Sequence, residues 1–417
     1  MKKLKALILS LACLLTLCSC SKNVENQADQ VSEVASNSEP SIVSSATIGN
    51  MGDLLIHSPI LNAYYSKEND SYNFDSIFTY IKPYVQKHDY AAVDLEGSLA
   101  GSDYSGYPMF RCPDSLIDSA KNAGFDMFLI ANNHSNDGLS QGFMRTMDVL
   151  SEKGVDYIGS RQSDSYKNYI VKDINGIKIG MVNYTYGTIS NDQVVAVNGI
   201  LSTEETSKLI NVFDYNNLDS FYSKQEQVIK NMKDDGAEAI VYYMHWGTEY
   251  LLDSSPQQKE IAQKLCDLGV DVIVGGHPHV VEPIEVLSSN ALDKKMVCLY
   301  SMGNAISNQR KEFLMEDITT GHTEDGLLFT IGFSKYSNGD VVLSKVDALP
   351  TWVNMKVNSV GRREYEIIPL DKSLDWASSF NMDSNTLSKA NDSYNRTMDL
   401  IGEGLKDSQS VLGQKTK

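Results

Sequence analysis

The chain has 417 residues and carries 36 lysines and arginines against 54 aspartates and glutamates, which gives a formal net charge of −18. This charge has the wrong sign for non-specific binding to nucleic acid or to anionic lipid, so both are excluded as general activities of the surface. An anionic envelope polymer, as substrate or ligand, would need a local cation at its binding site.

Residues 1–19 have the pattern of a signal peptide. Three lysines in the first five residues precede an apolar run, residues 6–17, that is too short to span a membrane as a mature helix. The run ends in Leu17-Cys18-Ser19-Cys20, which resembles the lipobox of bacterial lipoproteins. We therefore expect cleavage before Cys20, lipidation of Cys20, and a location on the extracytoplasmic face of the bacterial cell membrane. The alternative is an ordinary signal peptide with incidental cysteines.

Four cysteines would remain after cleavage: Cys20, Cys112, Cys266 and Cys298. With Cys20 acylated, at most one disulfide can form, which excludes a disulfide-framework protein. Cys266 and Cys298 lie in apolar runs, and we expect both to be buried.

Residues 20–45 are rich in Ser, Asn, Gln, Glu and Val and lack aromatic residues. This composition predicts a disordered, lipidated tether. No other run of about 18 apolar residues occurs, so the lipid is the only expected tie to the membrane. Ordered structure is expected from Ala46.

Apolar strand patterns then alternate with helical ones, which predicts an α/β domain built on a largely parallel sheet. The segment 187–222 is irregular and polar, and is interpreted as an insertion or lid. A kink is expected at Pro83 in the first helix. The expected strands are 47–50, 90–95, 126–131, 155–159, 178–184, 239–244, 271–274 and 296–301, and the expected helices are 73–87, 113–123, 139–153, 223–235 and 256–268.

The last hundred residues differ in pattern. Residues 311–370 are interpreted as a β-rich completion of the same domain, with strands and hairpins from 326 onward and a turn at Ser337-Asn338-Gly339-Asp340. Residues 371–417 are polar, and a weak helical pattern over 383–406 predicts a partly helical tail.

Five loops that follow predicted strands contain five of the seven histidines. Because the carboxyl ends of parallel strands meet at one edge of a sheet, these loops should form one site. The other two histidines, His88 and His322, are expected to be plain surface residues. The five loops are Gly52–His57, Asp94–Gly97, Asn132–Gly138, His245–Tyr250 and Gly275–Val281.

The segment Gly275-Gly276-His277-Pro278-His279 follows an apolar strand. In an extended backbone, residues i and i+2 face the same side, so both imidazoles could converge on one point. Two neutral imidazoles on a stiff turn form half of a metal site. The alternative is a pair of surface histidines.

The candidate ligands combine carboxylate, amide and imidazole groups and include no thiolate. Such a set suits a catalytic site for manganese, iron, zinc or magnesium better than structural zinc. Six side chains exceed the needs of one tetrahedral ion, which favours two divalent ions bridged by one carboxylate. The candidates are Asp53, Glu96, Asn133, His245, His277 and His279.

Seven sequence blocks, in this order, resemble the bacterial capsule-synthesis CapA family, also called the poly-γ-glutamate capsule biosynthesis or PgsA-like family. That family is similar to calcineurin-like metallophosphoesterases. The resemblance implies a layered α/β/β/α sandwich over residues 46–310, with a small strand-rich C-terminal portion and a polar tail. The blocks are Gly52-Asp53, Asp94-Leu95-Glu96, Asn132-Asn133-His134 with Asp137-Gly138, Tyr184-Thr185-Tyr186-Gly187, His245-Trp246-Gly247-Thr248-Glu249-Tyr250, Gly276-His277-Pro278-His279 and Tyr300-Ser301-Met302-Gly303-Asn304.

The resemblance also implies a role for each candidate. His134 would be the catalytic residue, as a general acid or as a donor to a developing oxyanion. The implied ligands are Asp53 and His279 for the first metal, Asn133, His245 and His277 for the second, and Glu96 as the bridge.

Two motifs depart from the phosphoesterase pattern. His57 lies four residues after Asp53, where the pattern is Asp-x-His, so we expect His57 to contact substrate or support a ligand; the alternative is that His57 ligates a metal. Glu96 stands where the pattern has Asp.

Five further residues are expected near the site, in contact with substrate or behind the ligands. Trp246 either walls the pocket or stacks on substrate. Glu249 either supports His245 or is a solvated acid. Arg111 either binds an anionic substrate or is a surface arginine. Asn304 and Gln309 are expected to support the site.

Three functions remain open on the sequence. The first is a membrane-anchored metal-dependent hydrolase that cleaves a phosphoester or an amide in capsule, poly-γ-glutamate or related envelope polymer biosynthesis. The second is a non-enzymatic, metal-binding accessory subunit that works with membrane subunits of a polymer synthase or exporter. The third, an extracytoplasmic solute-binding lipoprotein, suits the anchor but not the ligand-rich loops.

Overall fold

The computed structural model describes residues 39–314 and 320–416. The predicted signal peptide 1–19 and the lipidation site Cys20 lie outside the described residues. The first strand, β1, begins at Ile42. The predicted start of order at Ala46 is therefore four residues late, because residues 42–45 pair with the neighbouring strand β18.

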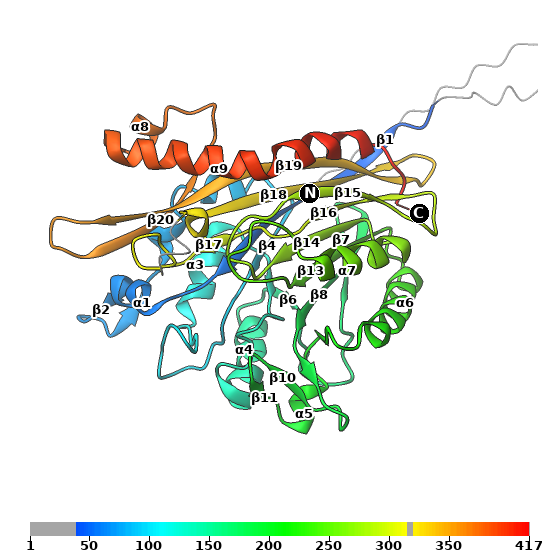
Figure 1. The fold of residues 1–417 in the computed structure, drawn as a ribbon, viewed down its shortest axis with the longest axis horizontal. Coiled ribbons are helices and arrows are strands. Elements are labelled where there is room, and N and C mark those ends of the chain that lie inside the picture. Colours follow the sequence, from blue (N-terminus) through cyan, green and yellow to red (C-terminus); the bar gives the residue numbers. More distant parts are fainter. Residues whose placement is uncertain (1–38, 315–319, 417) are drawn as a thin grey trace, which may run out of the picture. The chain divides into compact units, whose positions relative to one another are not determined.

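The first of two large sheets has eight strands in the order β20-β19-β18-β1-β4-β5-β6, with β17 paired to the end of β1 (Figure 1). Strands β1, β4, β5 and β6 are parallel, whereas β18, β19 and β20 are antiparallel. The bounds are β1 Ile42–Leu54, β4 Tyr90–Asp94, β5 Met127–Leu129, β6 Asp156–Ile158, β17 Asn304–Ile306, β18 Asp325–Tyr336, β19 Val341–Val357 and β20 Arg363–Pro369.

The second sheet has seven strands in the order β12-β8-β13-β14-β16-β15, with β7 beside β8. Strands β8, β13, β14 and β16 are parallel, so this sheet also presents carboxyl ends along one edge. The bounds are β7 Ile170–Ile174, β8 Ile177–Tyr186, β12 Val212–Phe213, β13 Ala239–His245, β14 Val272–Gly276, β15 Ile284–Ser288 and β16 Lys295–Leu299.

Three apolar clusters define the layers. One lies between the sheets and joins residues such as Ile48 of β1 with Val241 of β13. The other two pack helices on the outer sheet faces, α3 and α4 on the first sheet and α6 and α7 on the second. The expected α/β/β/α sandwich is confirmed. The helix bounds are α3 Ser115–Ala123, α4 Leu139–Glu152, α6 Leu218–Asp234 and α7 Pro256–Asp267.

Local sequence explains the helix ends nearest the site. Ser255 accepts a hydrogen bond from the Gln258 N–H, and Pro256 occupies the first turn of α7, where its missing N–H costs nothing. These signals fix where the chain turns back after β13, and they hold the loop 246–254 between two rigid elements.

The predicted C-terminal tail is a long helix that belongs to the domain. Helix α9 (Ser384–Ser408) packs across both sheets, with Ile401 in the cluster between them and Gly404 against the Ile284 carbonyl of β15. Figure 1 shows α9 running along β18 and β19. The predicted hairpin turn at residues 337–340 is confirmed between β18 and β19.

Two expectations about secondary structure, for the segments 73–87 and 187–222, were wrong. The helix predicted over 73–87 is a 3₁₀ turn, Asp75–Phe78, followed by the short helix α2, Lys82–Val85, because Pro83 cannot continue a preceding helix. The segment 187–222 is more regular than expected: it holds β9 (Thr188–Ile189), β10 (Val195–Val197), β11 (Ile200–Leu201) and α5 (Glu204–Ser207) before α6 begins.

The described part of the chain has no helix that is both long and apolar enough to cross a membrane. Its three cysteines, Cys112, Cys266 and Cys298, are buried free thiols. The expected burial of Cys266 and Cys298 is confirmed.

Candidate metal centre

The carboxyl ends of five strands from the two sheets meet at one place. Asp53 lies near the end of β1, His245 is the last residue of β13, and Glu96 follows β4 by two residues. All three side chains are buried, with exposed fractions of at most 1%. Two glycines allow the segment 300–303 to approach β14 and β1 closely. A Cβ at Gly275 would lie 1.8 Å from the Tyr300 carbonyl oxygen, and a Cβ at Gly52 would lie 1.8 Å from the Gly303 carbonyl oxygen.

Three overlapping groups of side chains could each hold a metal ion: Asp53, Asp94 and His245 form one, and Glu96 belongs to the other two. Of the two groups with Glu96, one is Glu96, His245 and His277, and the other is Asp53, Glu96 and His279; within each group the ligand atoms lie within 4.8 Å of one another. Glu96 Oε1 lies 3.9 Å from His245 Nε2, and Glu96 Oε2 lies 3.7 Å from His279 Nδ1. The two carboxylate oxygens therefore face the two groups separately.

The imidazole of His245 is oriented by a carboxylate that the sequence analysis did not single out. Asp94 Oδ2 lies 2.9 Å from His245 Nδ1, and Asn132 Nδ2 donates to Asp94 Oδ1 at 2.9 Å. Because Asp94 accepts the Nδ1–H, the lone pair of Nε2 is directed toward Glu96 and toward Asn133 Oδ1, which is 2.8 Å away. Asn133 thus joins the group that contains His245.

The histidine turn after β14 is tighter than predicted. His277 has φ +98° and His279 has φ +58°, so the expected extended backbone is wrong. Non-glycine residues rarely adopt positive φ, and such strain persists where the surrounding structure over-determines it. Here the Tyr250 N–H donates to the Pro278 carbonyl at 2.8 Å. The turn separates the two imidazole centroids by 6.0 Å and directs each ring into a different group.

The centre leaves an unusual number of buried polar atoms without partners. Among the described residues, Asp53 Oδ1, both carboxylate oxygens of Glu96 and His277 Nδ1 have no hydrogen bond. Unpartnered buried polar atoms are destabilising unless a ligand satisfies them. All four are lone-pair donors that face inward, so the residues present fit bound cations.

Crowded carboxylates set the electrostatics of the centre. Burial, with the carboxylates of Asp53, Asp94 and Glu249 nearby, raises the pKa of Glu96 well above its ordinary value. Burial also raises the pKa of Asp94 to about 7, against the opposing effect of its Asn132 hydrogen bond. A cation at the centre would reverse both shifts.

The imidazoles divide according to their neighbours. Burial lowers the pKa of His245 to about 3 and the pKa of His277 well below its ordinary value, so both are neutral and can ligate. Burial also opposes charge on His279, but its hydrogen bond to Asp53 Oδ2, at 3.1 Å, leaves the pKa of His279 raised.

His134 lies at the centre without being part of either group. Its Nδ1 donates to Asp137 Oδ2 at 2.7 Å, and its Nε2 lies 4.0 Å from Glu96 Oε1. The Phe110 ring packs edge-on against the imidazole, with centroids 4.6 Å apart, and the Phe110 N–H also donates to Asp137. This arrangement fixes the tautomer and directs Nε2 toward the space beside Glu96.

His57 borders the centre but is in neither metal group. The Asn308 N–H donates to His57 Nδ1 at 3.2 Å. Burial lowers the pKa of His57 to about 4, so the ring is neutral, and its Nδ1 also lies 3.2 Å from the Leu55 carbonyl oxygen. His57 packs beside Phe110, at a ring-centroid distance of 5.0 Å, as a residue that supports the centre.

Arg111 and Trp246 both lie behind the centre. Arg111 is half-buried and donates from Nε to the Asp137 carbonyl at 3.0 Å, so it is not a solvated surface arginine. Trp246 is fully buried, and its indole N–H donates to the Tyr300 carbonyl at 2.9 Å. Trp246 therefore packs in the core and has no exposed face on which a substrate could stack.

A hydrogen-bond chain connects the exposed Glu249 to the ligand His279. Glu249 accepts from the Tyr250 hydroxyl, which in turn accepts from Gln309 Nε2 at 3.1 Å. Asn304 Nδ2 donates to Gln309 Oε1 at 2.9 Å, and Asn304 Oδ1 lies 3.2 Å from His279 Nδ1. The supporting positions expected for Asn304 and Gln309 agree with this geometry.

The two remaining histidines are less exposed than predicted. His88 is half-buried, with Nε2 2.8 Å from the Thr330 hydroxyl, and His322 is also half-buried. Both lie outside the metal groups. The expectation that they are plain surface residues was wrong.

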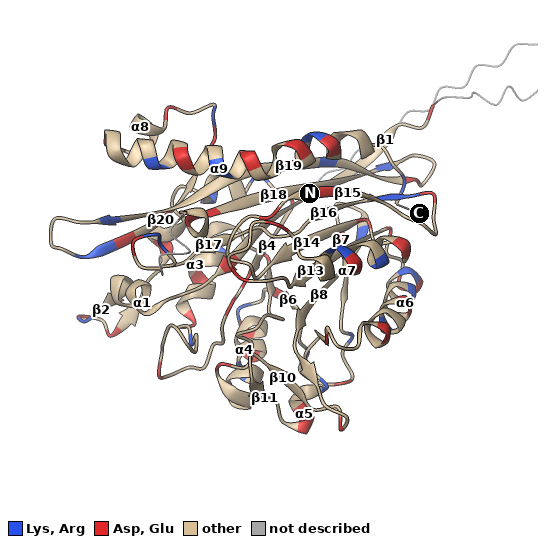
Figure 2. Ribbon diagram, in the orientation of Figure 1, with Lys and Arg blue, Asp and Glu red and all other residues tan. Residues whose placement is uncertain are grey.

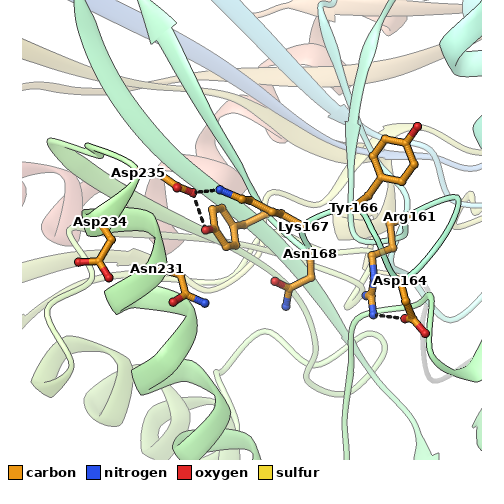
Figure 3. Close-up of a pocket in the computed structure, with 9 residues that line it drawn as sticks. Arg161, Asp164, Tyr166, Lys167, Asn168, Asn231, Asp234 and Asp235 are labelled. Atoms are coloured by element: carbon orange, nitrogen blue, oxygen red, sulfur yellow. Dashed lines mark hydrogen bonds and ion pairs between the residues drawn. The ribbon is translucent and has the colours of Figure 1, made fainter.

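A separate surface pocket of about 390 Å³ lies between the segment 161–169 and helix α6 (Figure 3). Its cations are already paired, Lys167 with Asp235 at 2.5 Å and Arg161 with Asp164 at 3.1 Å. The Tyr169 hydroxyl also donates to Asp235, at 2.6 Å. None of the metal-centre residues lines it.

Comparison with known families decides the relationship. Residues 47–309, more than half of the chain, match the model of the bacterial capsule synthesis protein family PGA_cap. The chain belongs to this family. The resemblance found in the sequence is thereby confirmed, and every metal-centre residue described above lies within the matched range.

Two curated members of the capsule synthesis family are similar to the chain. Capsule biosynthesis protein CapA of Bacillus anthracis is 29% identical over 245 residues, which are 57% of this chain and 55% of that protein. PGA biosynthesis protein CapA of Bacillus subtilis (strain 168) is 26% identical over 265 residues, 62% of each chain. The chain thus spans less than two thirds of the length of either relative.

Two solved structures overlap with the chain at low similarity. The calcineurin-like phosphoesterase YfkN from Bacillus subtilis is 13% identical with a TM-score of 0.39, over 88% of this chain and 99% of that chain. The sulfate thiohydrolase SoxB from Thermus thermophilus is 12% identical with a TM-score of 0.37, over 78% of this chain and 56% of that chain. At these TM-scores, neither supports a conclusion about this chain.

Proposed function

We propose that this member of the capsule synthesis family is a metal-dependent phosphoester hydrolase with a dinuclear centre. The observation that carries the proposal is the position of Glu96, whose two oxygens face separate ligand groups while neither has a hydrogen-bond partner among the described residues. Such a carboxylate is suited to bridging two cations, and the mixed oxygen and nitrogen ligands suit manganese, iron, zinc or magnesium.

Each cation would have its own ligands in addition to Glu96. Asp53 and His279 would hold one, and Asn133, His245 and His277 would hold the other. When bound, the ions would supply Lewis acidity to a phosphoryl group and neutralise its charge. Asp94 would keep His245 in the tautomer that ligates, since it accepts the Nδ1–H.

His134 would move the proton during hydrolysis. Asp137 accepts its Nδ1–H, so Nε2 is the atom directed into the centre, and in the imidazolium form of His134 it would give its proton to the leaving oxygen. General acid catalysis of this kind contributes about 10²–10⁴-fold to a rate.

The test compares His134→Gln with the wild type in the full-length chain, purified in detergent and loaded with Mn²⁺. Both proteins should bind two metal ions by elemental analysis, since His134 is in neither metal group. The variant should hydrolyse phenyl phosphate or diphenyl phosphate, whose leaving oxygens need a proton, about 10²–10⁴-fold more slowly. The matched control is His88→Gln, a half-buried histidine bonded to Thr330, which should retain full activity.

Absence of turnover on both esters, with two metals bound, would count against a hydrolase. A single bound metal would contradict the dinuclear centre. Equal activity in the His134→Gln variant would remove the proton-transfer role while leaving metal-dependent hydrolysis in place.

We also propose that the protein acts in capsule, poly-γ-glutamate or related envelope polymer synthesis at the outer face of the cell membrane. The printed names of both relatives refer to capsule or PGA biosynthesis. The lipobox-like sequence ending in Cys20 supports an anchor there. Radiolabelled palmitate should label the wild type in cells, and Cys20→Ala should abolish the label.

The relatives' names favour a second candidate function, because biosynthesis does not by itself require hydrolysis. In that case the chain is a non-enzymatic, metal-binding accessory subunit beside membrane subunits of a polymer synthase or exporter. Complementation separates the two: a deletion strain rescued equally by wild type and His134→Gln supports the accessory subunit, and rescue by wild type alone supports the enzyme.

A further inference from the structure

Four large apolar side chains are exposed on segments next to the metal-centre loops: Tyr107 and Leu251 in loops, Leu139 at the start of α4 and Leu201 in β11. Tyr107 is 78% exposed, Leu201 72%, Leu139 56% and Leu251 51%. Exposed apolar residues are common singly, but a set placed around a functional centre is typical of a binding surface. We call these four residues the apolar rim.

Two rim residues are tied to the catalytic histidine. Tyr107 precedes Phe110 by three residues, and the Phe110 ring packs on His134. Leu139 follows Asp137 by two residues, and its N–H donates to the Asn136 carbonyl at 2.8 Å. Both residues therefore lie on segments next to the His134–Asp137 pair, one through Phe110 and the other through Asn136.

The other two are tied to the same loops. Asn136 Nδ2 donates to the Ile200 carbonyl at 3.2 Å, which places β11 and Leu201 beside the segment that carries Leu139. Leu251 follows Tyr250, whose N–H is bonded to Pro278 between the two ligand histidines. The apolar rim thus combines residues from the segments that follow β4, β5 and β13 with one residue of the three-stranded sheet β11-β10-β9.

The backbone at Leu139 adds a second reason to assign it a function. Its φ is +54°, in the left-handed region where glycine and asparagine are favoured. A leucine here is unfavourable both for the backbone and for its exposed side chain. Strain of this kind is concentrated at functional sites.

The rim loops have little positive charge. Segments 97–111, 133–139, 186–203 and 246–254 contain no lysine and one arginine, Arg111, which is engaged with the Asp137 carbonyl. Figure 2 shows β10 and β11 without charged residues. The same segments contain five acidic residues against one arginine, a net charge of −4, which disfavours an extended polyanion. The acidic residues are Asp103, Asp137, Asp192, Glu249 and Asp253.

We propose that the substrate is an amphiphilic phosphoester, in which a phosphate held at the metal centre is linked to a hydrocarbon chain that lies on the apolar rim. This inference rests on the proposed hydrolase function and names its substrate class. In the reaction, water forms a new P–O bond, the ester P–O bond breaks, the leaving oxygen takes a proton from His134, and the proton that the water loses restores His134. The products are a phosphate and a lipid alcohol, or two fragments of a diester.

The experiment measures chain-length dependence with the full-length, Mn²⁺-loaded protein in a non-ionic detergent. The substrates are dibutanoyl and dioctanoyl phosphatidic acid, which share a head group, with p-nitrophenyl phosphate as a soluble reference. The longer ester should have a kcat/KM at least about tenfold higher, because its extra methylenes are removed from water on the rim.

A rim variant tests the location. The triple variant Tyr107→Ser, Leu201→Ser, Leu251→Ser should reduce the ratio of kcat/KM between the two esters to about one. The matched control is Val357→Ser with Val360→Ser, two residues 62% and 81% exposed at the β19–β20 turn, and it should keep the wild-type ratio. If the triple variant melts early or loses metal, the single variant Tyr107→Ser should still lower the ratio.

Three results would overturn the inference. Equal kcat/KM for the two esters in the wild type, with p-nitrophenyl phosphate hydrolysed, refutes the amphiphile and leaves the hydrolase standing. If the rim variant and the control variant change the ratio of kcat/KM between the two esters equally, the apolar rim is not where the hydrocarbon chain binds. Absence of turnover on all three compounds refutes the hydrolase and this inference with it.

Discussion

Two buried carboxylates, Glu96 and Asp325, are the most instructive pair in the molecule. Both are at most 1% exposed. Asp325 accepts hydrogen bonds from Arg396 Nε at 2.9 Å, Arg396 Nη2 at 2.8 Å and the Ser393 hydroxyl at 2.6 Å. Glu96 has no hydrogen-bond donor among the described residues and is surrounded by other carboxylates.

The difference distinguishes a structural charge from a functional one. A buried carboxylate with all its donors in place attaches one element to another, here α9 to the start of β18. A buried carboxylate without donors destabilises the fold and is retained only where a ligand satisfies it. The comparison therefore predicts opposite effects when each charge is removed.

Glu96→Gln should produce the largest effect. Loss of the bridging carboxylate should lower metal-dependent turnover by at least about 10⁴-fold, or ~5 kcal/mol of barrier. In the metal-free protein, the free energy of unfolding of the same variant should be higher than that of the wild type by about 1–3 kcal/mol, because burying the neutral amide costs less than burying the carboxylate. Kinetics with Mn²⁺ and urea unfolding with chelator measure the two effects.

The matched substitution is Asp325→Asn, measured at pH 8. Burial raises the pKa of Asp325 to about 7 against the effect of Arg396, so the carboxylate is ionised at that pH. Asp325→Asn should destabilise the fold with or without chelator. If both variants shift the unfolding midpoint in the same direction, the distinction between the two carboxylates fails.

Removal of Arg396, the ion-pair partner of Asp325, should have the next largest effect. Arg396→Ala leaves Asp325 buried and unpaired, which should lower the free energy of unfolding by about 3–5 kcal/mol. Activity per folded molecule should be unchanged, since among the described residues Arg396 donates hydrogen bonds to Asp325 and to the Gly321 carbonyl, and neither residue is in a metal group. Urea unfolding and kcat on p-nitrophenyl phosphate check this prediction; a lower kcat with intact metal content would mean that α9 acts on the centre.

Much of the fold follows from local sequence. Buried strands such as Tyr90–Asp94 are short apolar runs, and α7 has both its capping residues in sequence. The helix predicted over 73–87 failed for a stated reason: Phe74, Ile77, Phe78, Ile81 and Val85 have helical spacing and are all buried, but Pro83 divides the segment. The strands of 188–201 are two or three residues long and depend on contacts that sequence does not show.

The candidate metal ligands could be grouped from the sequence because their chemical types and their places after strands are visible in it. The residues that orient these ligands could not be predicted from the sequence. Asp94 and His245 are 151 residues apart and lie in different sheets, so their 2.9 Å contact exists only in the folded chain. Asp137 was within a recognised block, and its spacing of three from His134 is the signal that could have identified the pair. The positive φ of His277 was hidden by the adjacent glycines and proline.

Glu282 tests the comparison at an intermediate point. It is fully buried, Gln258 Nε2 donates to its Oε2 at 2.7 Å, and its Oε1 has no partner among the described residues. It lies in neither metal group. It therefore has one donor, where Asp325 has three and Glu96 has none.

Burial raises the pKa of Glu282 to about 8, against the Gln258 hydrogen bond. Between the ordinary value and pH 8, the folded chain holds a proton that the unfolded chain has released, so stability falls as pH rises. From pH 5 to pH 7 this amounts to about 2–3 kcal/mol, at ~1.4 kcal/mol per unit. Glu282→Gln should remove that slope, so the variant should match the wild type near pH 5 and exceed it at pH 8. Urea unfolding of the chelated proteins across this range measures the difference, and parallel curves would show that the single Gln258 donor is enough to keep Glu282 ionised.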